Sequence, residues 1–217
     1  MSESIAGQHV VVTGGTGALG QVVVARLLEA GAVCHVPSHR GDGDVRVERD
    51  GRLHIVGGVE LIDEASVDRF YGTLPELWAS VHLAGGFAMS PLTDTTQQDF
   101  RQMFAINALT VFLCCRAAVG VMRRAGRGGR LVNVAARPAL DPRKGAYMAA
   151  YAASKAAVAA LTQTLAEELK SERILVNAIA PSTIDTPANR AAMPDADPAK
   201  WLTPQAAAEA ILHLASP

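Results

Sequence analysis

The sequence has little of the features that define several large classes of protein. Only 5% of its 217 residues are aromatic, and the formal net charge is −1. A chain so close to neutral lacks the basic surface that attracts nucleic acid or an acidic membrane. No apolar run approaches the ~20 residues that a membrane-spanning helix needs. We therefore expect neither a nucleic-acid partner nor a membrane partner.

Cysteines and histidines are also sparse. Cys34, Cys114 and Cys115 and the six scattered histidines lack the spacing of metal ligands, so no metal site is predicted. Buried free thiols are typical of a reducing compartment. The N-terminus, MSESIAGQHV, lacks the basic and apolar regions of a signal peptide. These observations favour a cytoplasmic protein.

Short apolar runs alternate with stretches of helical periodicity along the whole chain. The predicted strands are residues 9–13, 32–37, 54–61, 80–84, 131–134 and 174–180. The predicted helices are residues 18–30, 63–74, 95–125, 148–169 and 204–215. Between residues 38 and 53 we expect a short polar excursion with a hairpin-type turn at Asp50 and Gly51. The alternation predicts one α/β domain over residues 1–217, with a parallel sheet of six or seven strands and helices on both faces.

A glycine-rich turn, GGTGALG, joins the first predicted strand to the first helix. Such a turn lets the backbone approach a dinucleotide pyrophosphate, and the helix N-terminus that follows favours its negative charge. The order of elements predicts a three-layer Rossmann-type fold. A turn that serves packing alone is the alternative, because a glycine pattern by itself is weak evidence. The expected contacts are Gly14, Thr16, Gly17, Ala18, Leu19 and Gly20.

The end of the second predicted strand bears on the choice of cofactor. An acidic residue there would bind the ribose hydroxyls of NAD, but this sequence has Ser38, His39 and Arg40. A serine can hydrogen-bond a phosphate and an arginine can clamp it. We therefore favour NADP, with NAD possible. A solvated basic turn is the alternative reading.

Tyr151 and Lys155 are four residues apart in a predicted helix and therefore share a face. A lysine ammonium beside a phenol favours the phenolate and lowers the pKa of the tyrosine. The pair could then transfer protons near neutral pH. A surface aromatic beside a solvated lysine is the alternative, and a neighbouring cofactor would decide between the two.

Five motifs in order resemble the short-chain dehydrogenase/reductase family. They are TGGTGALG at 13–20, LAGG at 83–86, the asparagine of FAINALT, YAASK at 151–155 and VNAIAPSTIDTP at 176–187. The resemblance implies that Tyr151 transfers the proton, Lys155 lowers its pKa and binds the ribose, and Asn107 holds a relay water. It also implies cofactor contacts at Glu60, Leu61, Ala84, Gly85, Gly86, Pro181, Thr183 and Thr186.

The main departure from the family is Ala136, which stands where a catalytic serine usually binds the substrate carbonyl. One branch, the quinonoid dihydropteridine reductases, shares this alanine and resembles the segment 182–201, which implies a quinonoid dihydropterin as substrate. The branch also contains bacterial reductases with other substrates. Arg137 and Tyr147 are candidate substrate contacts, with a solvated loop position and a packing or surface role as their alternatives.

The expected function is that of an NAD(P)H-dependent oxidoreductase that transfers hydride to a small substrate. A cofactor-binding regulatory or structural protein without turnover is one alternative, and a carbonyl reductase of unrelated substrate is another. Family members usually continue past the last helix into a further strand, so either the sheet has six strands or that strand lies outside this sequence. A homodimer is expected through helices 95–125 and 148–169, although packing on their own sheet is the competing use of those faces.

Overall fold

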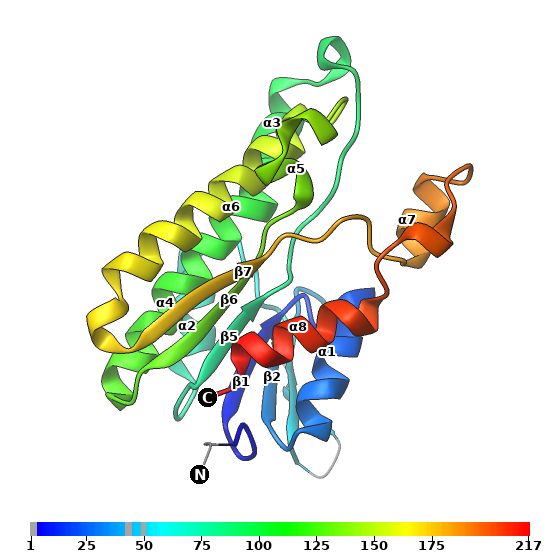
Figure 1. Ribbon diagram of the computed structural model, residues 1–217. Coiled ribbons are helices and arrows are strands. Elements are labelled where there is room, and N and C mark those ends of the chain that lie inside the picture. The colour runs from blue at the N-terminus through cyan, green and yellow to red at the C-terminus, as the bar shows by residue number, and fades with distance from the viewer. Residues whose placement is uncertain (1–3, 42–44, 49–50) are drawn as a thin grey trace.

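The computed structural model describes residues 4–41, 45–48 and 51–217. One sheet of seven strands runs through this part of the chain in the order β3-β4-β2-β1-β5-β6-β7 (Figure 1). Every neighbouring pair is parallel except β3 with β4. The strands are β1 His9–Thr13, β2 Val33–Pro37, β3 Val45–Glu48, β4 Leu53–Val56, β5 Ala79–His82, β6 Gly129–Val134 and β7 Ile174–Ile179.

The six parallel strands confirm the predicted α/β fold, and their burial explains why the apolar runs along the chain are so clear. Val10, Val11 and Val12 of β1 are fully buried, and all four residues of β5 are buried as well. A parallel sheet covered on both faces requires apolar side chains on both faces of its central strands. An unbroken apolar run is therefore the expected sequence of such a strand.

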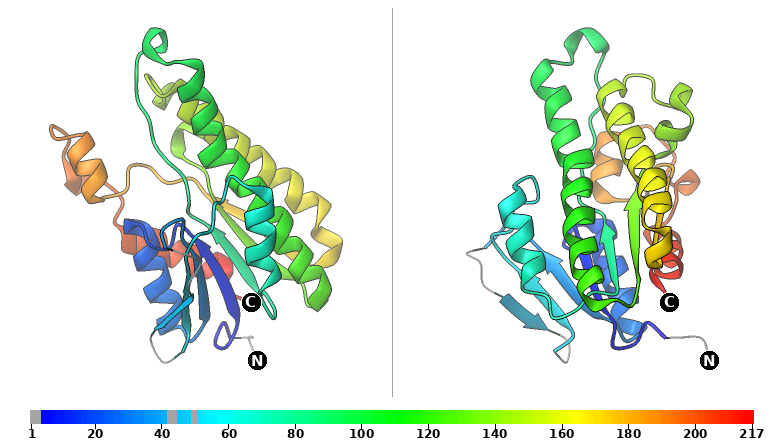
Figure 2. Two further views of the ribbon diagram at one scale, coloured as in Figure 1. Left: turned by 180° about the vertical axis from the view of Figure 1, so that it is seen from behind. Right: turned by 90° about the vertical axis from the view of Figure 1, so that its left-hand side faces the viewer.

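Helices cover both faces of the sheet, so the fold has three layers (Figure 2). One core, under α2, α4 and α6, includes Tyr71, Met122 and Val158, and the other, under α1 and α8, includes Leu27 and Ile211. The helices that build the layers are α1 Ala18–Glu29, α2 Glu64–Gly72, α3 Gln97–Phe104, α4 Thr110–Ala125, α6 Ala149–Glu168 and α8 Pro204–Ala215.

The helix predicted over 95–125 is confirmed as one helical run, Gln97–Ala125, that contains a π-helical turn. Between α3 and α4 lies a π-helical turn, η2 Ala105–Leu109, which carries Asn107. By length and composition the stretch Gln97–Ala125 could cross a membrane, because its most apolar window has a mean hydropathy of 1.9. The expectation that no apolar run approaches the length of a membrane-spanning helix is therefore wrong for this stretch. Half of its most apolar window, 50%, is buried inside the protein, as in a core helix.

Several loops contain more structure than the sequence predicts. The third predicted strand, 54–61, is the shorter β4, and the polar excursion contributes the antiparallel edge strand β3. Of the predicted hairpin turn, Gly51 has a positive φ of 79°, whereas Asp50 lies outside the described residues. Two short helices, α5 Arg137–Leu140 and α7 Pro187–Ala192, stand in segments predicted as loops.

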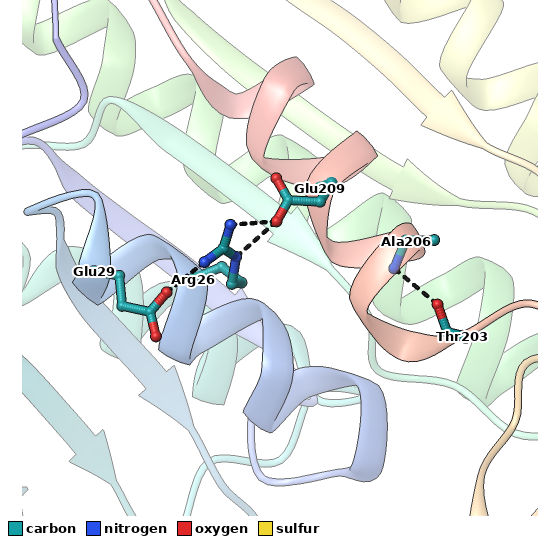
Figure 3. A network of polar contacts seen from close by, with 5 residues as sticks. All are labelled: Arg26, Glu29, Thr203, Ala206 and Glu209. Carbon is teal, nitrogen blue, oxygen red and sulfur yellow. Dashed lines mark hydrogen bonds and ion pairs between the residues drawn. The ribbon is translucent and has the colours of Figure 1, made fainter.

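The last helix is fixed to the first one on the outside of the sheet. In Figure 3, Arg26 of α1 lies between Glu29 of the same helix and Glu209 of α8. All three side chains are exposed, so these ion pairs add little to the free energy of unfolding. The apolar contact beneath them, with Ile211 and Ala208 fully buried, holds α8 in place.

The loops that follow β1, β2, β5, β6 and β7 meet at one edge, because parallel strands end at the same side of a sheet. The strand order reverses at β1, which has β2 on one side and β5 on the other. A crevice outside the carboxyl ends of the strands at such a reversal is where open α/β sheets bind ligands. The predicted site residues lie in these loops.

Candidate active site

The turn after β1 is shaped for close backbone approach. Gly14 has a φ of 68°, and a Cβ at that position would lie 2.7 Å from the backbone nitrogen of Ala84. A Cβ at Gly20 would overlap the carbonyl oxygen of Gly14. Glycine is therefore required at both positions, because any side chain would open the turn. Ala18, one of the expected cofactor contacts, is the first residue of α1.

The N-terminus of α1 is free to bind an anion. Gly17 is its N-cap residue and provides no side-chain hydrogen bond, and no acidic residue lies in the first turn. The unpaired N–H groups of a first helical turn and the helix dipole together attract phosphate. The turn and this helix start thus fit a dinucleotide pyrophosphate.

A cavity of ≈ 360 Å³ opens beside this turn. It joins the ends of β1, β2 and β5 to the segment after β4, which is where an adenosine half would lie. Eight of the predicted cofactor contacts line it, namely Gly14, Thr16, Ser38, His39, Glu60, Leu61, Ala84 and Gly85. Arg40 is exposed and does not line it; its backbone N–H donates to Ser38 Oγ at 3.2 Å.

A second cavity, of ≈ 390 Å³, lies at the ends of β6 and β7. Both Tyr151 and Lys155 line it, so the helical spacing predicted their common face correctly. Seven predicted site residues share this wall, namely Ala136, Arg137, Tyr151, Lys155, Pro181, Thr183 and Thr186. The other lining residues were not predicted as site residues from the sequence, namely Phe87, Val134, Ala135, Pro138, Lys144, Met148, Ser182, Ile184, Asn189 and Met193.

Lys155 lies between the two cavities. Its side chain is 7% exposed, and its Nζ donates a hydrogen bond to the Val134 carbonyl oxygen at 2.8 Å. A Cβ on Gly85, which lines the first cavity, would lie only 3.5 Å from that Nζ. Burial lowers the pKa of Lys155 from 10.5 to about 8, because the charged form loses hydration.

Tyr151 does not have the lowered pKa that its spacing from Lys155 predicted. Burial raises the pKa of the phenol, and the Lys155 ammonium is hydrogen-bonded to Val134 instead. The Tyr151 ring packs edge-on against Phe87, with centroids 5.0 Å apart and planes at 77°. The tyrosine is therefore held as a neutral phenol, which is the form that can donate a proton.

Asn107 is fully buried and uses its side chain to fix the segment after β5. Its Oδ1 accepts from the Gly86 N–H at 3.0 Å, and its Nδ2 donates to the Gly86 carbonyl at 3.1 Å and to Ser154 Oγ at 3.1 Å. A Cβ on Gly85 would lie 2.5 Å from Asn107 Oδ1. The asparagine thus links the cofactor cavity to α6, which carries Tyr151.

One of the predicted substrate contacts, Tyr147, lies outside the wall of the second cavity, whereas Ala136 lines it. Ala136 is buried, with 3% exposed, and places a methyl group in the cavity wall. Tyr147 does not share the helix face of Tyr151, because α6 begins only at Ala149 and Tyr147 precedes it with a left-handed φ of 63°. Its side chain is 67% exposed and lies outside the cavity wall.

Comparison with known proteins places the chain in a family. The family profile described as short chain dehydrogenase matches residues 8–197. The chain therefore belongs to the short-chain dehydrogenase/reductase family of NAD(P)-dependent oxidoreductases. This confirms the resemblance that the motifs indicated.

Individual relatives agree with this assignment. Galactitol 2-dehydrogenase of Rhizobium johnstonii is 32% identical over 229 residues, covering 97% of this chain and 88% of that protein. Sorbitol dehydrogenase of Cereibacter sphaeroides is 34% identical over 132 residues, covering 58% of this chain and only 50% of that protein. The match thus spans about half the length of the latter relative. Neither relative is named a dihydropteridine reductase.

Solved structures support the fold. A short-chain type dehydrogenase/reductase from Mycobacterium ulcerans superposes with a TM-score of 0.86 at 22% sequence identity, over 99% of this chain and 85% of that chain. At this identity the likeness establishes the architecture alone. The arrangement of strands and helices described above is therefore that of the family.

Proposed function

We propose that this protein is an NADPH-dependent reductase in which Tyr151 donates the proton to a small substrate. The proposal rests on one observation, namely that Tyr151 and Lys155 line the same cavity. Lys155 also approaches Gly85 of the neighbouring cavity, whose walls fit a dinucleotide. Proton transfer and cofactor binding would thus meet at one lysine.

Three residues of the chain have separate roles in the proposed reduction. The nicotinamide cofactor, when bound, supplies the hydride, and the protein orients the substrate and delivers the proton. Tyr151 Oη donates its proton to the substrate atom that gains electron density. The Lys155 ammonium then stabilises the resulting phenolate by its charge. Asn107 keeps the Gly85–Gly86 segment in place between the two cavities through its bonds to Gly86.

The preference for NADP rests on the residues at the end of β2. Ser38 and His39 line the cofactor cavity, and no acidic residue stands beside them in the wall except Glu60. The Ser38 hydroxyl can donate to a ribose 2′-phosphate, and the exposed Arg40, two residues further on, can reach the same phosphate. NAD remains the competing cofactor.

A quinonoid dihydropterin is the proposed substrate. Such a ring presents no simple carbonyl that needs a serine, and Ala136 leaves only a methyl group at that position of the wall. The resemblance of residues 182–201 to the dihydropteridine reductases supports the same substrate. The polyol names of the two relatives make sugar alcohols and their ketones the main competing class.

The experiment is a screen of NADPH oxidation with quinonoid dihydropterin and a panel of ketones and aldehydes. Tyr151→Phe removes only the proton donor and should lower kcat at least ~10²-fold on any accepted substrate. Tyr147→Phe is the matched control, since it removes the same hydroxyl outside the cavity. Equal kcat values for the two variants would sink the catalytic role of Tyr151.

A second candidate function is cofactor binding without turnover. Ala136 favours it, because a methyl group stands at the wall position where family members usually carry a serine that donates to the substrate carbonyl. The same screen separates the two proposals. Tight NADPH binding in calorimetry with no oxidation on any substrate would support the regulatory role and contradict the reductase.

We further propose a homodimer through α4 and α6. Leu109 just before α4 is 39% exposed and Phe112 within it is 46% exposed, although both are large apolar residues. On α6 the exposed positions include the small residues Ala153 and Ala160, which permit close helix approach. Phe112→Arg should shift the mass measured by light scattering from dimer to monomer, whereas the wild type should remain dimeric.

A further inference from the structure

We propose that the substrate carries an acid group, and that Arg137 and Lys144 bind it at the mouth of the Tyr151 cavity. This proposal rests on the proposed reductase function of the same site. It concerns which part of the substrate the protein recognises, not the group that reacts, so a quinonoid dihydropterin would fit it only with an acid group in its side chain. The geometry of the cavity wall and its charges carry the argument.

The charge of the wall is one-sided. Three cationic side chains line the cavity, Arg137, Lys144 and Lys155, and no aspartate or glutamate is among its lining residues. Most of the remaining wall is apolar, with Phe87 and Met193 among its members. Charges beside an apolar wall interact more strongly than charges in open water. The cavity therefore favours an anion over a neutral or cationic ligand.

Two of these three cations have no side-chain partner in the part of the chain that the structure describes. Lys155 donates to the Val134 carbonyl at the buried end of the cavity. Arg137 and Lys144 are exposed, and neither side chain has a hydrogen bond or ion pair to any residue that the structure describes. Asp141, the one acid in the segment 137–144, does not line the cavity. The two rim cations are thus available to a ligand.

The position of the rim cations sets the shape of the ligand. Arg137 begins α5 and Lys144 ends the 3-10 turn Pro142–Lys144, so both lie in the segment between β6 and α6. That segment enters α6 a few residues before Tyr151, which donates the proton. A ligand that extends from Tyr151 to the two rim cations would place its reacting atom at Tyr151 and its acid group at the rim. A guanidinium and an ammonium on the wall of one cavity suit a carboxylate or a phosphate.

The test compares benzaldehydes that carry either an acid group or its neutral ester at the para position. We would measure kcat/KM with NADPH for 4-carboxybenzaldehyde, 4-formylphenyl phosphate and the methyl ester of the first. The carboxylate or the phosphate should exceed the ester about tenfold, and the advantage should shrink as salt is added. Equal values for all three probes would overturn the proposal, and the larger of the two acid values identifies the group that the rim prefers.

Substitutions of the two rim cations test whether the preference for the acid over the ester arises at this site. Arg137→Gln and Lys144→Gln should each reduce the acid-to-ester ratio about threefold, and the double variant should abolish it, while Arg137→Lys retains part of it. Arg143→Gln is the matched control, because Arg143 is an exposed cation of the same segment that does not line the cavity. A control that lowers the ratio as much as Arg137→Gln would show that only the net charge matters, and would refute the site.

Two further measurements separate this proposal from its premises. If the rim cations held a cofactor phosphate, Arg137→Gln would raise the Kd for NADPH as much as it raises the KM for the acid, and the proposal would be wrong. If no aldehyde is reduced, calorimetry with 4-carboxybenzaldehyde and its ester on the NADP-loaded protein still decides the matter. Preferential binding of the acid, lost in the double variant, would support the anion site even though the reductase function had failed.

Discussion

The two cavities that meet at Lys155 are built by different means. The cofactor side depends on backbone shape: a Cβ at Gly14 or Gly20 would collide with neighbouring backbone, and the strands behind the turn are fully buried. The substrate side depends on side chains carried by short elements. Its helices α5 and α7 have no buried residue, and α7 is fixed at its base by a bridge between Ile184 and Leu202. Figure 1 shows α7 standing away from the sheet.

This difference indicates which part of the site can change. A side chain added to the cofactor side disturbs the turn and the core together, because the backbone there has no free space. A side chain changed on α5 or α7 alters the cavity wall and little else, because these two helices have no buried residue. Substrate preference should therefore vary among proteins of this fold more readily than cofactor binding.

The strongest test of the cofactor side is Gly20→Ala. The added Cβ would overlap the Gly14 carbonyl, so the turn must open, and we expect the Kd for NADPH to rise at least ~100-fold. Gly120→Ala is the matched control, because a Cβ at that α4 position meets nothing within 4 Å. The control should raise the free energy of unfolding slightly, by up to ~1 kcal/mol, because alanine favours a helix more than glycine does. Unchanged NADPH affinity in Gly20→Ala, measured by calorimetry, would show that the turn does not bind the cofactor.

Acid should destabilise the protein through two buried histidines on the cofactor half. Burial lowers the pKa of His35 and of His82 from 6.5 to about 4 in the folded protein. For His35 the charges of His9 and His54 contribute as well. Between pH 6.5 and pH 4 the unfolded chain binds these protons and the folded chain does not. Stability is therefore full above pH 6.5 and is lost as the pH falls towards 4, by roughly 3 kcal/mol for each histidine.

Denaturant titrations at several pH values measure this loss. His82→Gln should flatten the slope of unfolding free energy against pH between 6.5 and 4, whatever it does to the stability at neutral pH. His213→Gln, which changes an exposed residue of α8, is the control. A slope that His82→Gln leaves unaltered would contradict the assignment of the acid sensitivity to this residue. No histidine occurs between residues 83 and 212, so the substrate side contributes none of the effect.

The sequence predicted the two sides unequally. The cofactor turn, β1, β5 and the Tyr151–Lys155 face were predicted because glycine, apolar runs and helical spacing are local signals. The antiparallel strand β3 was not, because its polar sequence VRVE pairs only at the edge of the sheet. Lys144 and Asn189 were missed since they reach the cavity only through the path of the loops. Asn107 was recognised from the sequence as an asparagine within an apolar helix. Its hydrogen bond to Gly86 could not be predicted, because it depends on how the fold brings the two segments together.

The pKa of Tyr151 shows a further limit of sequence reasoning. Spacing placed Lys155 on the same face, but the atom that its ammonium contacts depends on the position of the β6 carbonyl at Val134. A hydrogen bond to that carbonyl follows from the packing of α6 against β6, which no motif encodes. The direction of a pKa shift therefore has to be derived from the three-dimensional structure, even where the residues themselves are identified correctly from the sequence.

A smaller effect is expected when Arg40 is replaced, namely on the ratio of NADPH to NADH affinity. Arg40→Ala should reduce the ratio of NADPH to NADH affinity about tenfold, the equivalent of ~1.4 kcal/mol, because one phosphate contact is lost. Arg143→Ala removes the same charge on the substrate side and should leave the ratio unaltered. A wild-type protein that binds NADH as tightly as NADPH would contradict the role of Ser38 and Arg40 from the outset.

Two matched helix caps give the finest test of the comparison. Thr203 begins α8 and accepts from the Ala206 N–H at 3.2 Å, and Thr186 begins α7 and accepts from the Asn189 N–H at 3.2 Å. Each threonine precedes a proline. Thr203→Ala should lower the free energy of unfolding by ~1 kcal/mol, because α8 is packed into the core through Ile211.

Thr186→Ala removes an equivalent hydrogen bond from a helix that buries nothing, so α7 can fray while the rest of the protein stays folded. Its unfolding free energy should change by less than ~0.3 kcal/mol, whereas its KM should rise, since Thr186 lines the Tyr151 cavity. Denaturant unfolding and steady-state kinetics on the same two variants measure both quantities. Equal losses of stability would mean that α7 unfolds together with the sheet, and that the substrate side is as firmly built as the cofactor side.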